Sequence, residues 1–171
     1  MGRGSKTTEF LKECMADALL KLMQEKPMER ISIQEITALA GVGRSTWFRN
    51  FSTKNEALSF KLLQLWCRWG PEHGMGSGTR YTVDNVGDFF QFNYEHRDVL
   101  LALYESGQQT AIYDAFFQIM MPQFDDAEAV YESRFLSYGL FGLLGEWMKR
   151  DFKETPEEMA SISKKFIFTT I

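Results

Sequence analysis

The short stretch RSTWFRN, which begins at Arg44, concentrates side chains that can hydrogen-bond to nucleic acid. The guanidinium of Arg44 can donate two parallel hydrogen bonds to O6 and N7 of guanine, and the hydroxyl of Ser45 can bond to several bases. Thr46, Asn50 and, a few residues later, Lys54 are of types that suit phosphate oxygens. Arg44 could equally contact phosphate without reading a base, so both roles stay open for it. The chemistry that this segment favours is binding to double-stranded DNA.

The residues before this stretch predict the helix that positions it. Ser32 can cap a helix start, and Glu35, three residues later, completes a capping box. Ser32 has a second candidate role, as a phosphate ligand at the helix start. Gly41 is the residue type that most readily adopts the left-handed conformation that ends a helix. Two short helices joined by a tight glycine turn form a helix-turn-helix, whose second helix enters the DNA major groove. We expect the first of these helices to bury a stripe of Ile33, Ile36, Leu39 and Ala40, which recur at helical spacing.

The second helix of this motif divides into two faces. Trp47 and Phe51 are four residues apart and share one face, so we expect them to lock the helix against its neighbours. Arg44, Ser45 and Phe48 lie on the opposite side, towards DNA. The ring of Phe48 can touch a thymine methyl group or a sugar edge.

The same segment resembles the DNA-binding region of the tetracycline-repressor (TetR) family. The family pattern is an Ala-Gly-Val turn, a Thr-aromatic-Tyr-x-x-Phe recognition helix, and a Lys followed by Glu-Ala-Leu. Here these motifs read Ala40-Gly41-Val42, Thr46-Trp47-Phe48-Arg49-Asn50-Phe51, Lys54 and Glu56-Ala57-Leu58. The resemblance covers roughly the first third of the chain and is specific, because turn, aromatic spacing and flanking helices agree together. Phe48 departs from the pattern, since it lacks the phenolic hydroxyl of the family's tyrosine.

The resemblance implies a transcriptional regulator, more often a repressor, that binds a palindromic double-stranded DNA operator as a homodimer. It implies a three-helix helix-turn-helix DNA-binding domain over residues 1–53 and a helical effector-binding and dimerisation domain over 54–171, with a helix over 54–69 linking the two. The positions that it implies for DNA contact are Ser32, Gly43, Arg44, Ser45, Thr46, Phe48, Arg49, Asn50 and Lys54.

Apolar residues at helical intervals predict an all-α chain of about nine helices, with no strand-like alternation. The first helix runs from about Thr8 to Gln24, and Thr53 with Glu56 forms a second capping box. Glycines and a proline make 70–82 the clearest loop. The remaining helices are predicted over about 54–69, 83–94, 97–105, 108–121 and 127–151, with a last one that begins near Pro156.

Composition and charge limit the class of protein. Hydrophobic content is 44% and charged content is 25%, as in a soluble globular protein. The net charge of −4 at first argues against binding to nucleic acid, but its distribution favours it. Residues 1–55 hold nine Lys or Arg against six Asp or Glu, a net of +3, and the remainder holds ten against seventeen, a net of −7. A basic DNA-facing end on an acidic body suits DNA docking, although chance variation in surface charge gives the same asymmetry.

Several function classes are not favoured by the sequence. No apolar run is long enough to span a membrane, and no charged-then-apolar signal peptide opens the chain, so we expect a cytoplasmic protein. Cys14 and Cys67 are isolated within helical patterns, where we expect core positions. No nucleophile–base pair, metal-ligand cluster or paired carboxylate stands out, so we expect no enzyme activity, no cofactor and no metal.

The segment 132–151 is apolar almost all round, which is more than one small core absorbs. Glycines at three-residue intervals also form a groove in which another helix can approach closely. That helix could belong to a second copy of the chain or to the same chain. We expect this helix and the last one to pair with a second copy of the chain, and the TetR resemblance implies the same four-helix interface. The predicted interface consists of Phe135, Tyr138, Gly139, Gly142, Leu143, Ile162 and Phe166.

The middle helices carry many aromatic side chains, among which the TetR resemblance implies a cavity for a small hydrophobic effector. A plain aromatic core would have the same spacing. The effector would favour a conformation that re-aims the DNA-binding helices, so that DNA is released. The alternative is a TetR-like regulator without an effector that is controlled by a partner protein. The predicted pocket residues are Phe89, Phe90, Tyr104, Tyr113, Phe116, Phe117, Met120 and Trp147.

Overall fold

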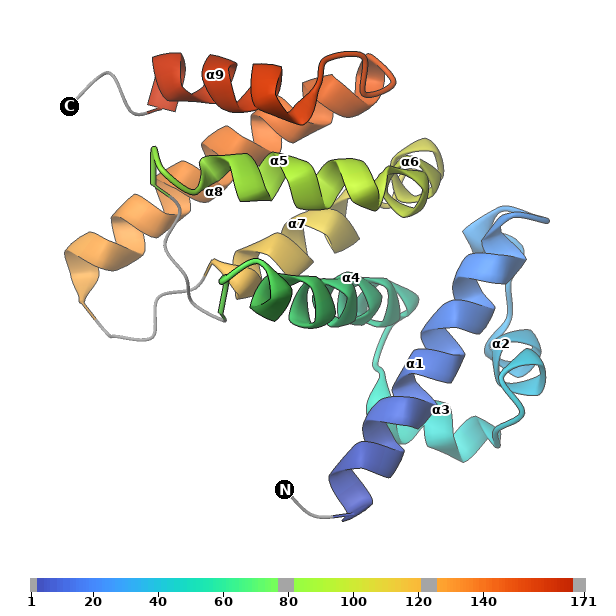
Figure 1. Ribbon diagram of the computed structural model, residues 1–171. Helices are drawn as coiled ribbons and strands as arrows, with labels where there is room; N and C mark the ends of the chain where they lie inside the picture. The colour runs from blue at the N-terminus through green and yellow to red at the C-terminus, as the bar shows by residue number, and fades with distance from the viewer. Residues whose placement is uncertain (1–2, 77–81, 121–125, 168–171) are drawn as a thin grey trace.

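The computed structural model describes residues 3–76, 82–120 and 126–167. Within these ranges the chain forms nine α-helices and one short 3-10 helix and no strand, which confirms the all-α prediction (Figure 1). The 3-10 helix η1 covers Met28–Arg30. The α-helices are α1 (Arg3–Met23), α2 (Ile33–Leu39), α3 (Arg44–Asn50), α4 (Lys54–Glu72), α5 (Val86–Glu95), α6 (Arg97–Glu105), α7 (Gln109–Ile119), α8 (Ala127–Lys149) and α9 (Pro156–Ile167).

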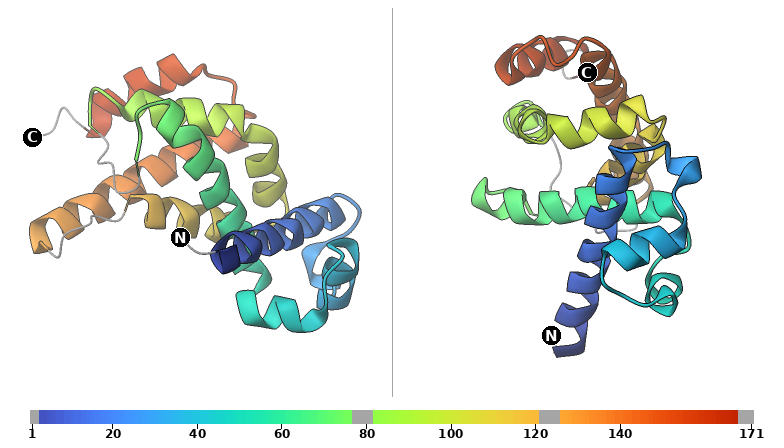
Figure 2. Two further views of the ribbon diagram at one scale, coloured as in Figure 1. Left: turned by 60° about the horizontal axis from the view of Figure 1, so that its bottom comes forward. Right: turned by 90° about the vertical axis from the view of Figure 1, so that its right-hand side faces the viewer.

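The helices form two groups joined by α4 (Figures 1 and 2). Helices α1–α3 pack on one another at one end of the molecule, which we call the head. Helices α5–α9, which we call the body, occupy the other end, where α5 packs on α9 and α8 contacts α6, α7 and α9. Helix α4 packs against α1 of the head and α7 of the body. A displacement of α4 would therefore change the packing in both the head and the body.

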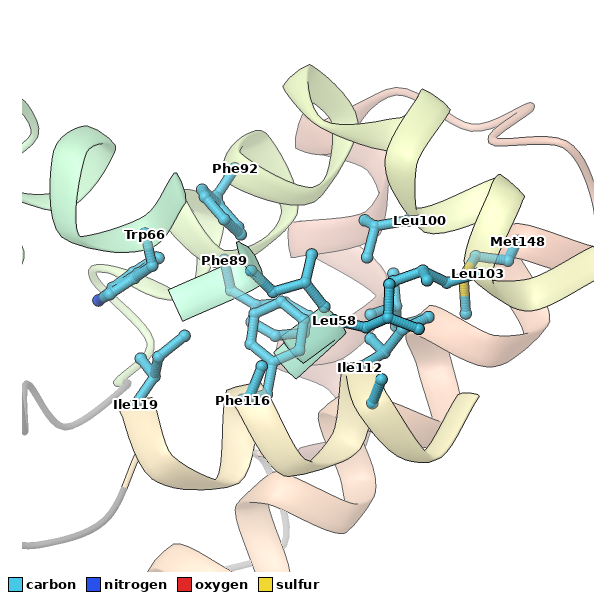
Figure 3. Close-up of a cluster of buried hydrophobic side chains, with 14 of the residues drawn as sticks. Leu58, Trp66, Phe89, Phe92, Leu100, Leu103, Ile112, Phe116, Ile119 and Met148 are labelled. Carbon is cyan, nitrogen blue, oxygen red and sulfur yellow. The ribbon is translucent and has the colours of Figure 1, made fainter. Parts of the chain in front are cut away.

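One continuous hydrophobic core runs from the head through α4 into the body. In the body, Trp66 of α4 meets Phe92 of α5 edge-on with ring centroids 5.1 Å apart. Phe89 of α5 lies 5.2 Å from Phe116 of α7, and the four rings fill the space between these three helices (Figure 3). Such tilted and edge-to-face pairs add to the free energy gained by burying the rings.

Local signals set the helix ends in the head. The hydroxyl of Ser32 accepts a hydrogen bond from Glu35 N–H, and the Glu35 carboxylate accepts one from Ser32 N–H, so the predicted capping box is confirmed. Gly41 has φ +67°, the left-handed value expected at the turn. At α4, Thr53 caps the helix as predicted, but the carboxylate of Glu56 accepts from Ser52 N–H instead of from Thr53.

Helix α4 extends past the predicted end at residue 69 as far as Glu72, because a proline near a C-terminus removes only one helical hydrogen bond. Gly70 lies within this last stretch, where a Cβ would come within 2.6 Å of the carbonyl oxygen of Met75. Cys67 is exposed on the outer side of α4, so the predicted core position is wrong for it, whereas Cys14 is half-buried. In the described residues, no helix combines the length and the apolar character that a membrane crossing requires.

Candidate nucleic-acid interface

The outer face of α3 presents polar and aromatic side chains to solvent. Arg44, Ser45, Phe48 and Arg49 are all exposed, and 63% of the Phe48 surface is accessible. Arg49 Nη2 donates a hydrogen bond to Ser45 Oγ one turn earlier, at 3.4 Å, so these two side chains lie side by side. Gly43, the N-cap of α3, is also exposed. The residues predicted to face DNA are accessible together, while DNA contact itself stays a prediction.

The inner face of α3 is fixed by two buried aromatic rings. Trp47 is 1% exposed and Phe51 is 2% exposed, and their ring centroids lie 5.2 Å apart. Phe51 in turn meets Phe60 of α4 edge-on at 5.8 Å. The orientation of α3 is therefore set by contacts with α4 as well as by the turn that precedes it.

The residues predicted to hold phosphate already have partners within the head. The amide of Asn50 donates to the carbonyl oxygen of Thr46 at 2.7 Å, and both residues are half-buried. The ammonium of Lys54 donates to the carbonyl oxygen of Met28 in η1 at 2.6 Å. This contact between segments 26 residues apart ties the start of α4 to η1. An ammonium has three N–H donors, so this one bond leaves Lys54 further donors for phosphate.

Ser32 takes part in a small charged network at the start of α2. Its hydroxyl both accepts from Glu35 N–H and donates to Glu35 Oε2, at 3.2 Å and 2.9 Å. The Lys26 ammonium forms an ion pair with the same carboxylate. The Lys26 hydrogen bond, with the Ser32 bonds second, lowers the pKa of Glu35 to about 2. The structure therefore accounts for Ser32 as a cap, and its phosphate role stays a prediction.

A second charged network connects the head to α4. Lys61 of α4 pairs with Asp17 of α1 at 2.6 Å and with Glu13 of α1 at 3.2 Å. Arg68, two turns further along α4, also pairs with Glu13 at 2.5 Å. Partial burial would raise the pKa of Glu13, but the hydrogen bonds from Arg68 and Lys61 outweigh it and lower that pKa. These pairs hold α1 along α4, and with it the whole head.

The predicted dimer residues lie on an exposed part of α8 and on α9. Phe135 is 74% exposed, Tyr138 is 63% exposed, and Phe166 of α9 is 71% exposed. Tyr131, which the sequence prediction did not include, is 77% exposed and continues the same stripe one turn earlier. The spacing of 131, 135 and 138 along one helix face was the signal that could have found it. Of the other predicted interface residues, Gly139 and Gly142 are exposed, and Leu143 and Ile162 are half-buried.

The eight residues predicted to line an effector pocket are divided between the core and the surface of the body. The rings of Phe90 and Trp147 lie 5.7 Å apart in the core, where Phe89 and Phe116 are also buried (Figure 3). Met120 is buried as well, and Tyr104 is half-buried.

Tyr113 and Phe117 lie on another side of α7, where the Tyr113 ring packs at a tilt against Tyr138 of α8, with ring centroids 5.1 Å apart. Partial burial, and then the hydrogen bond with Tyr138, raise the pKa of Tyr113 to about 12. Phe117 borders a cavity of about 380 Å³ between α1, α4 and α7, and the other seven predicted pocket residues do not border this cavity.

Comparisons with known proteins agree with this architecture. Residues 16–58 match a family model described as "Bacterial regulatory proteins, tetR family", and residues 84–169 match one described as "Transcriptional regulator C-terminal region". Among solved structures, a TetR transcriptional regulator from Rhodococcus sp. RHA1 is similar, with a TM-score of 0.62 and 16% sequence identity. The alignment covers 98% of this chain and 99% of that one, and at this identity it shows a shared fold. No curated protein matches this chain.

Proposed function

Because this chain belongs to the TetR family of bacterial regulatory proteins, we propose that it is a repressor that binds a palindromic DNA operator as a homodimer and releases it when an effector binds. Family membership makes it a DNA-binding transcriptional regulator. Repression, operator symmetry, the homodimer and effector control are the finer parts of the proposal.

The exposed face of α3 is the observation that carries DNA binding. Arg44 opens this helix, where side chains reach base edges in the major groove, and it is exposed. Trp47 and Phe51 hold the opposite face in the core, so the exposed face has a fixed direction. Phe48, exposed beside Arg44, is suited to the methyl group of a thymine.

The aromatic stripe on α8 supports the homodimer. Tyr131, Phe135 and Tyr138 are large, mostly exposed side chains on one helix, and Phe166 adds another from α9. Exposed apolar patches of this kind mark interaction surfaces. A second copy related by a two-fold axis would cover the stripe with the same stripe and would place two α3 helices on one palindrome.

Effector control is supported by the open cavity between α1, α4 and α7, because it lies between the head and the body. The packed aromatic core gives less support, since rings such as Phe90 and Trp147 occupy the space between the helices themselves. A ligand that favours one orientation of the head would change the distance between two α3 helices and weaken operator binding.

The test is a selection of operator duplexes from a random library by the purified protein, followed by titrations of variants at several salt concentrations. Arg44→Ala should cost about 1–3 kcal/mol on the selected operator and relax the preference at one base pair per half-site. Lys54→Ala should weaken the operator and a scrambled duplex alike and reduce the salt slope by about one unit per site. Lys149→Ala, exposed at the far end of α8, is the matched control and should change neither.

Two results would contradict this reading. If the library yields no enriched sequence, sequence-specific DNA binding is wrong. If Arg44→Ala weakens both duplexes equally, Arg44 is a phosphate ligand. The thermal stability of Lys54→Ala is measured in parallel, because this variant also loses the bond to the Met28 carbonyl, and only the salt slope reports phosphate contact.

A further inference from the structure

The cavity of about 380 Å³ between α1, α4 and α7 has walls from both the head and the body. Lys12 and Phe51 come from the head, Phe60 comes from α4, and Asp114 and Phe117 come from α7. Its volume falls within the range of small-molecule sites. It is also separate from the packed aromatic core, in which Phe89 and Phe90 are buried.

The walls of this cavity already bind cations of the protein itself. The ammonium of Lys12 lies 4.6 Å from the ring centroid of Phe60 and 5.1 Å from that of Phe51. The guanidinium of Arg134, from α8, stacks on the ring of Phe117. Aromatic faces attract cations because of their negative electrostatic potential. Each of the three phenyl rings around the cavity is therefore placed where it stabilises a positive charge.

Carboxylates outnumber cations among the lining residues. Glu56 and Asp114 carry two negative charges, and Lys12 is the one cation among the described residues that line the cavity. Arg134 lies outside the lining, over the Phe117 ring, and adds a second positive charge nearby, so Asp114 itself and not a local excess of charge is the partner for a cation. The Asp114 carboxylate is held by Asn55, whose Nδ2 donates to Asp114 Oδ2 at 3.1 Å from across the cavity wall. The part of the chain from residue 56 onwards has a net charge of −7, which adds to the attraction for a cation.

From this geometry we propose that the cavity between α1, α4 and α7 binds an organic cation, an ammonium group carried on an apolar body. Asp114 is the counter-ion, Phe117 and Phe60 contact the apolar body, and Lys12 limits affinity by its like charge. Such a ligand would touch the head through α1 and the body through α7. Binding of the ligand would then shift the orientation of the head and change operator affinity. Because the two binding events are coupled, DNA would change ligand affinity by the same factor. This regulatory half rests on the proposed function, whereas the binding half does not.

The binding half is tested on the full chain without DNA. Isothermal titration would compare three probes of one shape: 4-phenylbutylammonium, the neutral 4-phenylbutan-1-ol and the anion 4-phenylbutanoate. We expect the ammonium to bind about tenfold or more tightly than the other two, since only it pairs with a partly buried carboxylate. Asp114→Asn, which keeps the shape of the side chain, should reduce ammonium affinity to that of the alcohol. Asp98→Asn, an exposed aspartate on α6, is the matched control and should leave affinity unchanged.

A second variant gives a gain in binding that misfolding cannot imitate. Lys12→Met keeps the length of the side chain and removes its charge, so ammonium affinity should rise about fivefold, as expected for removing a like charge several ångströms away. Four results would each overturn the site. The protein could bind the anion best, bind the ammonium and the alcohol equally, bind none of the probes, or bind the ammonium with unchanged affinity in Lys12→Met. Ammonium binding that leaves operator affinity unchanged would overturn the regulatory half alone.

Discussion

Replacing Phe135 by alanine should separate the proposed homodimer into monomers. Phe135 exposes 74% of its surface in the single chain. A phenylalanine side chain covers roughly 200 Å², so about 150 Å² is available for burial, and truncation to alanine removes about 100 Å² of it. At roughly 25 cal/mol per Å² this is about 2.5 kcal/mol for each copy, and a two-fold interface contains the residue twice. The loss approaches about 5 kcal/mol, or between three and four powers of ten in the dissociation constant.

That value is an upper bound, because a partner surface covers an exposed ring incompletely and some of the loss is recovered by repacking. We therefore expect an increase in the dimer dissociation constant of at least about a hundredfold, which corresponds to about 2.7 kcal/mol. Sedimentation equilibrium over a range of protein concentrations measures it directly. Circular dichroism of the same samples should show unchanged helix content, since Phe135 is 74% exposed in the single chain and truncating it leaves the core intact.

Phe10 provides a matched control for this experiment. It is 64% exposed, but it lies on α1 in the head, away from the α8 stripe. Phe10→Ala should leave the dissociation constant unchanged. Equal effects of the two substitutions would mean that aromatic exposure in general, and not the stripe, controls association. A stable monomer of the unaltered chain at micromolar concentration would refute the homodimer and leave the stripe to a partner protein.

Two further predictions concern the head. Trp47→Ala should lower the free energy of unfolding by about 3–5 kcal/mol, because it leaves a cavity where a fully buried ring packs between α3 and the rest of the head. Urea denaturation would measure this loss. A loss below about 1 kcal/mol would show that other contacts hold α3. Glu35→Gln should remove part of the acid sensitivity of the protein. The folded-state pKa of Glu35, about 2, lies below the ordinary value of 4.5 for a glutamate, so its contribution to stability is complete above pH 4.5 and is lost as the pH falls from 4.5 towards 2. The difference in unfolding free energy between wild type and Glu35→Gln, measured at several pH values, should become smaller as the pH falls from 4.5 towards 2. A difference that stays constant with pH would contradict the stabilising role of the Glu35 carboxylate.

The head was predictable because its signals are local. A capping box and a helix-ending glycine depend on residues three or four positions apart, and both Ser32 with Glu35 and Gly41 are arranged as the sequence predicts. The inward and outward faces of α3 follow from helical periodicity alone. The bond from Lys54 to the carbonyl of Met28 was not predictable, because it depends on how two segments 26 residues apart meet in space.

The body was less predictable for the same reason. Periodicity identifies aromatic residues on helices, but it does not distinguish a ring that borders a cavity from one that packs on another ring. Phe116 packs in the core, and Phe117, its neighbour in sequence, borders the cavity between head and body. The pairing of Asn55 with Asp114 joins residues 59 positions apart, so the composition of that cavity was not visible in the sequence either.

The continuity of the hydrophobic core has a consequence for the way in which the chain unfolds. Phe51 of the head packs on Phe60 of α4, and further along the same helix Trp66 packs into the body. A chain cut after the helix-turn-helix would leave Trp47 and Phe51 without the surface that covers them. The head is therefore not an independent folding unit, and heating should give a single cooperative transition in which DNA-binding and regulatory parts melt together. Exchanging heads between relatives would have to carry α4 along with the three helices before it.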